Sequence, residues 1–163
     1  MLVEAFEALT PEQREGLRVD LGFLPTPLPL ASYAGIRLNE AAQHSWDVRV
    51  AFDEDAAIDE ATAVLLVDHL ADGLGFMLGV SARADQVPEP AVVDLRSLEH
   101  DLSIADSVAL VPSGSRTTAT FAGSADAVAR LLAGRLTPGR TPQGVEVSGN
   151  LGLDDLRRVF PGY

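Results

Sequence analysis

Two long stretches in the first half of the chain place apolar residues at helical spacing. One covers residues 32–50, and the other runs from Asp59, a good N-cap residue, to about residue 78. Ser32 is a candidate cap for the first stretch. The short acidic segment 53–57 between them predicts an antiparallel pair of helices. Because such a pair cannot bury both apolar faces alone, it needs further helices from a partner chain or contact with the domain behind it.

Shorter elements come before this pair. Residues 2–9 are predicted to form a short helix. A second helix is expected over about 11–19, with Thr10 as its N-cap and Gln13 in the capping-box position. The glycine and the prolines of residues 20–30 indicate a loop.

After residues 84–90, whose prolines indicate a linker, the apolar period changes from helical to two. Strands are expected at 91–98, 102–105, 108–111, 117–122 and 145–148. One helix is expected to begin at Gly123-Ser124 and end near Gly134, and a closing helix is expected near residues 153–160.

This order of elements predicts an α+β protein. A helical segment over residues 1–85 is expected to precede a small α+β domain over residues 86–163, which contains an antiparallel sheet. At 163 residues and 47% hydrophobic content, the chain is large enough to bury a core.

Composition excludes several classes of function. No apolar run approaches the roughly 18 residues that cross a bilayer, and the acidic first residues are unlike a signal peptide, so we expect a cytoplasmic protein without a membrane partner. The net charge of −12 repels phosphate backbones, which argues against nucleic acid as a partner. The chain has no Cys, so any thiol used in a reaction must come from a small molecule. All its basic residues are Arg, which excludes Schiff-base chemistry.

The most informative candidate for chemistry is the pair Glu40 and His44. Residues at i and i+4 share one face of a helix, so a carboxylate and an imidazole meet there. They are two-thirds of a three-ligand catalytic metal site, and no third ligand is obvious elsewhere in the sequence. The alternative is an ordinary surface pair that stabilises the helix by a few tenths of a kcal/mol.

Other polar and aromatic residues are also candidates, and most have a structural interpretation. Asp47 either orients the His44 imidazole or hydrogen-bonds the helix end. Trp46 is expected in the core. His69, inside an apolar helix, is expected to be structural, although it is a possible replacement ligand. His100 lies between two acidic residues and is expected in a solvated turn.

Several segments carry a resemblance to a known family. The sequence RLNEAAQHSWDV over residues 37–48 resembles the third-helix signature of the mycothiol-dependent maleylpyruvate isomerase family. The segments that resemble its C-terminal domain are FAGSADA at 121–127, LLAGR at 131–135, VEVSGN at 145–150 and LRRVFPG at 156–162. The resemblance implies a DinB-like four-helix bundle, here only in part, joined to a C-terminal domain similar in shape to sterol carriers.

The resemblance also implies a site. In this family a divalent metal, usually zinc, is held by a His from the second bundle helix and by a Glu and a His from the third. The last two match Glu40 and His44, and the segment that carries the other His would lie before Met1. Mycothiol is the implied thiol cosubstrate. An Arg of the C-terminal domain contributes to isomerase catalysis in the family, and Arg135 is the candidate here; its place at a helix end has a structural explanation too.

Three functions therefore stay open. The first is a metal-dependent mycothiol S-transferase or isomerase whose site is incomplete or shared with another chain. The second is a non-catalytic binding module with vestigial ligands, which dimerises through its helices and holds a small thiol or an apolar ligand. The third is a truncated product without retained activity.

Overall fold

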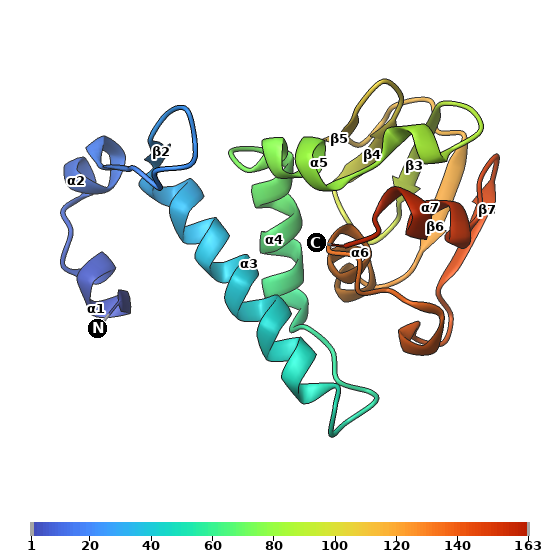
Figure 1. The fold of residues 1–163 in the computed structure, drawn as a ribbon, viewed down its shortest axis with the longest axis horizontal. Helices are drawn as coiled ribbons and strands as arrows, with labels where there is room; N and C mark the ends of the chain where they lie inside the picture. The colour runs from blue at the N-terminus through green and yellow to red at the C-terminus, as the bar shows by residue number, and fades with distance from the viewer. Residues whose placement is uncertain (1, 163) are drawn as a thin grey trace.

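The computed structural model describes residues 2–162 and confirms the α+β class. Its N-terminal part is helical, and a mixed sheet with its own helices follows (Figure 1). Within the described residues, the α-helices are α1 (Leu2–Glu7), α2 (Pro11–Gly16), α3 (Leu30–Arg49), α4 (Glu60–Ala71), α5 (Gly75–Ser81), α6 (Ala125–Leu132) and α7 (Leu153–Val159). Short 3-10 helices lie at η1 (Ala84–Gln86) and η2 (Pro138–Arg140).

The first two helices stand beside the N-terminal end of α3, away from the rest of the molecule (Figure 1). The predicted capping box before α2 is confirmed: the Thr10 side chain accepts a hydrogen bond from the Gln13 N–H at 3.2 Å, and the Gln13 side chain accepts one from the Thr10 N–H at 2.9 Å. The second helix ends at Gly16, short of the expected residue 19, and β1 (Arg18–Val19) follows it. This strand pairs antiparallel with β2 (Leu28–Pro29), which lies in the region expected to be only a loop.

Helices α3 and α4 form the predicted pair, which packs closely near the start of α3. The expectation that Ser32 caps α3 is wrong, because the helix begins at Leu30 after Pro29. Ser32 is instead buried and lies against Gly73, where a β-carbon would meet its hydroxyl group. Gly35 similarly leaves room for the His69 ring, whose Cγ would be 2.9 Å from an added β-carbon. The small residues therefore set how closely the two segments approach.

The stretch predicted as one helix from Asp59 to residue 78 is two helices. Asp59 caps α4 as expected, by accepting a hydrogen bond from the Thr62 N–H at 3.0 Å. The chain then bends by 84° between α4 and α5. The bend lets Leu78 of α5 pack in the same cluster as the sheet. No single described helix has the length and apolar character to cross a membrane, although the bent pair α4 and α5 meets that test by length and composition alone.

Five strands form one sheet within residues 2–162, in the order β5-β4-β3-β6-β7. They are β3 (Ala91–Leu95), β4 (His100–Ile104), β5 (Val108–Pro112), β6 (Ala119–Ala122) and β7 (Glu146–Gly149). The predicted antiparallel pairing holds for β3–β4, β4–β5 and β6–β7. The pair β3–β6 is parallel, with Val93 opposite Ala119. A parallel pair requires a crossover connection, so the sequence of short strands alone did not indicate it.

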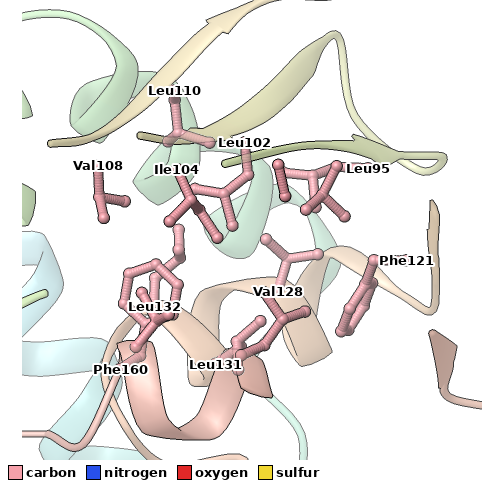
Figure 2. Close-up of a cluster of buried hydrophobic side chains, with 14 of the residues drawn as sticks. Leu95, Leu102, Ile104, Val108, Leu110, Phe121, Val128, Leu131, Leu132 and Phe160 are labelled. Carbon is pink, nitrogen blue, oxygen red and sulfur yellow. The ribbon is translucent and has the colours of Figure 1, made fainter. Parts of the chain in front are cut away.

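The core lies between the sheet and the helices of the C-terminal part (Figure 2). Leu102 and Ile104 of β4 face Val128 and Leu131 of α6 across this layer, and all four are fully buried. Val67 of α4 and Leu78 of α5 belong to the same cluster. A continuous core thus runs across residues 84–90, and the division into 1–85 and 86–163 stays a prediction.

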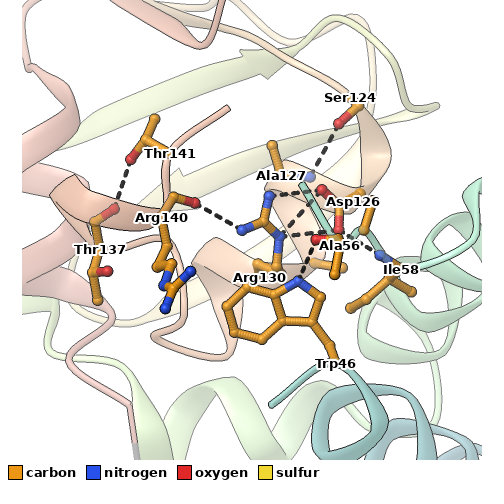
Figure 3. A network of polar contacts seen from close by, with 12 residues as sticks. Trp46, Ala56, Ile58, Ser124, Asp126, Ala127, Arg130, Thr137, Arg140 and Thr141 are labelled. Carbon is orange, nitrogen blue, oxygen red and sulfur yellow. Dashed lines mark hydrogen bonds and ion pairs between the residues drawn. The ribbon is translucent and has the colours of Figure 1, made fainter. Parts of the chain in front are cut away.

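A buried ion pair on α6 joins this core to the helical pair (Figure 3). Arg130 and Asp126 are only 3% and 6% exposed, and the guanidinium donates to both carboxylate oxygens at 2.8–3.1 Å. Asp126 also accepts from the Ile58 N–H at 2.8 Å, and Arg130 donates to the Arg140 carbonyl oxygen at 2.8 Å. The guanidinium carbon lies 4.9 Å from the centre of the Trp46 ring, a cation–π contact.

We predict that Asp126→Ala lowers the free energy of unfolding by about 3–5 kcal/mol, because Arg130 is then left buried without a counter-charge. Urea unfolding followed by circular dichroism measures this value. The matched control is Asp154→Ala, which removes a 78% exposed partner of Arg157 and is expected to change stability by about 1 kcal/mol or less. Equal effects of the two substitutions would contradict the prediction.

Candidate functional site

The predicted ligand pair meets on the exposed side of α3. Glu40 Oε2 lies 3.3 Å from His44 Nε2. The His44 side chain is 63% exposed and that of Glu40 is 38% exposed. The spacing of i and i+4 on one helix is sufficient to produce this contact.

The other ring nitrogen of His44 is held as well. Its Nδ1 lies 3.2 Å from Asp47 Oδ2, one turn further along the helix. A metal-ligating His normally has such a carboxylate partner on its second nitrogen, because this fixes the ring and its tautomer. Asp47 therefore contacts the imidazole, which was one of the two roles open for it from the sequence.

Arg135 completes the group from a distant part of the chain. Its Nε and one terminal nitrogen donate to the two oxygens of Asp47 at 2.8 and 2.9 Å, across 88 residues of sequence. Arg135 also donates to the Ala133 carbonyl oxygen at 3.1 Å. We call Glu40, His44, Asp47 and Arg135 the α3 tetrad.

The end of α6 explains where Arg135 lies. Gly134 adopts φ +71°, the left-handed conformation that glycine favours after a helix. The Gly134 N–H donates to Leu131 O at 2.9 Å and the Arg135 N–H to Arg130 O at 2.7 Å, which together are a Schellman motif. The predicted end of this helix near Gly134 is confirmed, and the motif turns Arg135 back toward α3.

The charges of the tetrad alter the acid–base behaviour of Asp47. Its pKa is lowered from the ordinary 3.8, first because Arg135 hydrogen-bonds the carboxylate, with further contributions from the charges of Arg135 and His44; partial burial acts in the opposite direction. Asp47 is thus an ionised acceptor for His44 Nδ1 at neutral pH. A neutral imidazole carries one ring proton, and when that proton is on Nδ1 toward Asp47 a lone pair remains on Nε2.

That lone pair faces a carboxylate oxygen. Two acceptors 3.3 Å apart repel one another unless a cation lies between them, and the cation is either a second proton on the imidazole or a metal ion. Two ligands of one tetrahedral zinc, each about 2.0–2.1 Å from the metal, are themselves about 3.3–3.4 Å apart. The separation of Glu40 and His44 therefore fits a shared metal, and it fits an imidazolium–carboxylate pair equally.

A complete metal site is not present among residues 2–162: no group of three or more His, Asp, Glu or Cys side chains there has the arrangement to hold a metal. His69, the possible replacement ligand, packs against Gly35. The expectation that His100 lies in a solvated turn is wrong. It begins β4, is only 20% exposed, and its Nδ1 lies 3.6 Å from Asp68 Oδ1, because α4 packs over this end of the strand.

Some polar residues at the α3–α6 contact were missed by the sequence analysis. Gln43 is 2% exposed; its Nε2 donates to the Ala129 carbonyl oxygen at 3.3 Å. Asp126 and Arg130 are the buried pair described above. The available signal was a charged i, i+4 pair within an otherwise apolar helix, a pattern that suits burial. Trp46 is 4% exposed, as expected for the core.

A cavity of about 520 Å³ borders the buried ion pair of Asp126 and Arg130. Its walls come from the loop after α3, the start of α6 and the segment around η2. The charged residues that line it are Glu54, Asp55, Glu60, Asp126, Arg130 and Arg140. The cavity is separate from the α3 tetrad, since the two have no lining residue in common.

Comparison of the sequence with protein-family models and with curated proteins found no match.

We predict that metal-free Asp47→Asn is less stable than the wild type at about pH 6 by about 0.5–1 kcal/mol, a small value because Asp47 is 38% exposed. Since the pKa of Asp47 is lowered in the folded state, its contribution is present above the ordinary value of 3.8 and is lost as the pH falls below it. The difference between wild type and variant should therefore shrink toward about pH 3.

Urea midpoints measured across this pH range in the presence of a chelator test the prediction. Asp106→Asn, at an exposed turn, is the control for the loss of one carboxylate. A difference that grows at acid pH would contradict the sign.

Proposed function

We propose that this chain is a metal-dependent thiol transferase or isomerase of the mycothiol-dependent type, with Glu40 and His44 as two ligands of a divalent metal, most simply zinc. The observation that carries the proposal is the α3 tetrad. A surface pair that only stabilises the helix does not require further residues to orient its imidazole. Here Asp47 fixes the ring, and a bidentate Arg135 from another part of the fold fixes Asp47.

The donor set suits this metal. One imidazole nitrogen and one carboxylate oxygen are ligands that zinc accepts, and a catalytic zinc retains at least one position for water or substrate. When bound, the metal lowers the pKa of a coordinated thiol and so supplies a thiolate nucleophile at neutral pH. The small-molecule thiol proposed here is mycothiol, on the basis of the sequence resemblance.

The chain's own residues have definite tasks in this proposal. His44 Nε2 and Glu40 Oε2 bind, Asp47 selects the tautomer that leaves Nε2 free, and Arg135 keeps Asp47 ionised and oriented. Arg135 was predicted to be catalytic. Its hydrogen bonds to Asp47 and Ala133 support a positioning role for it in the proposed site.

A second candidate function is a binding or interaction module in which the pair is vestigial. One observation favours it: the His44 side chain is 63% exposed, and a proton alone satisfies its contact with Glu40. The two candidate functions differ in whether zinc replaces the proton between His44 and Glu40.

We predict that the purified, chelator-treated chain binds zinc and that His44→Ala and Glu40→Gln each abolish this binding. Asp47→Asn should weaken it about 10–100-fold, as loss of a carboxylate behind a ligating His does elsewhere. Competition with a chromophoric chelator measures the affinity. Ser45→Ala, an exposed position on the same helix, is the control and should bind like the wild type.

If zinc binds, consumption of a low-molecular-weight thiol in the presence of an electrophile tests for transferase activity, with His44→Ala as the inactive reference. Zinc binding that is equal in His44→Ala and wild type would overturn the proposed function and favour the vestigial pair.

A further inference from the structure

The outward side of α3 carries a stripe of residues that does not face the rest of the molecule. Arg37, Ala41, His44 and Val48 recur at the spacing of one helical face, and all four are exposed. Val48 is 63% exposed although it is apolar. In Figure 1, α4 lies along one side of α3, and α1 and α2 lie beside only its N-terminal end. We call this stripe, together with Glu40, the outer α3 face.

We infer that two copies of this chain pair through their outer α3 faces, and that Glu40 and His44 of both copies together hold one divalent metal ion on the two-fold axis. The inference rests on the proposed function, because it takes Glu40 and His44 as ligands. It adds the source of the remaining ligands, which is a second copy of the chain.

The order of charges along α3 is complementary to its own reverse. An antiparallel pair of helices with its two-fold axis level with Ala42 brings residue i opposite residue 84 − i. Glu40 then faces His44 of the second copy, and Arg37 faces Asp47 of the second copy. A parallel pair would instead place Glu40 beside Glu40 and Asp47 beside Asp47, so the charges select the antiparallel arrangement.

This symmetry also matches the chemistry of the ligands. Each copy offers one nitrogen and one oxygen 3.3 Å apart, which is an edge of a zinc tetrahedron. Two such edges related by a two-fold axis supply four ligands, and a thiol would then bind as a fifth, in the five-coordinate state that zinc can also adopt. Ala41 lies beside them on the outer α3 face, and a residue this small permits close approach of two helices.

Size and charge together indicate that the pairing depends on the metal. A helix of 20 residues is about 30 Å long, and one crossing of two such helices buries less than the roughly 1,000 Å² expected of a stable interface. Each copy also has a net charge of −12, so metal-free copies repel one another. A divalent cation bound by two carboxylates and two imidazoles supplies attraction at the point of contact.

The test is sedimentation-velocity ultracentrifugation of the full chain, titrated with zinc chloride and reversed with a chelator. We expect a monomer without zinc and a dimer that contains one zinc ion per two chains. His44→Ala should abolish both the bound zinc and the dimer. Arg37→Glu keeps both ligands and places like charges opposite Asp47, so it should weaken the zinc-dependent dimer at least tenfold.

Arg116→Glu is the matched control, because it makes the same change of charge at an exposed loop away from α3 and should dimerise like the wild type. Zinc bound at one ion per monomer, with no dimer, would overturn the shared site while leaving the proposed function intact. A dimer that is insensitive to zinc and to His44→Ala would also overturn it. Absence of zinc binding in the wild type would overturn the proposed function and this inference together.

Discussion

The buried pair of Asp126 and Arg130 is the interaction on which the arrangement of the molecule depends. Burial of two charges is unfavourable unless each is fully paired, and here the carboxylate accepts from Arg130 and from the Ile58 backbone while the guanidinium lies over Trp46. These partners come from α6, from α3 and from the loop between α3 and α4. The pair therefore fixes the position of the helical part relative to the sheet and its helices.

The α3 tetrad depends on that arrangement. Because α6 is held against α3, the Schellman turn at its end brings Arg135 to Asp47. Asp47 then orients His44, and His44 faces Glu40. An α3 helix without the C-terminal part would retain the contact between Glu40 and His44 but would lose the group that fixes the imidazole. In the proposed function, the second part of the chain thus contributes to the site through position and not as a ligand.

In the inference drawn from symmetry, two chains that each supply two ligands complete one metal site at their outer α3 faces. The polar residues of this face, taken together with Asp47, are complementary in charge to their own reverse order about Ala42, and its small and apolar residues lie beside them. The opposite side of the same helix faces the core through Gln43 and Trp46. One side is fixed within the molecule by long-range hydrogen bonds. The other, in the proposed function, is available to a metal ion and, in the inference drawn from symmetry, to a second copy.

The sequence by itself determined what depends on neighbours within one or two turns. The Thr10 and Asp59 caps, the strands and the contact of Glu40 with His44 are of this kind, because the groups involved are three or four residues apart or follow a local period. Only the tertiary structure decided the bend after α4, the parallel pairing of β3 with β6 and the partial burial of His100. It also decided that Arg135 meets Asp47 across 88 residues. These features depend on which distant segments pack together. A hydrophobic pattern indicates that one face of a helix or strand is buried, but it does not indicate which segment covers that face.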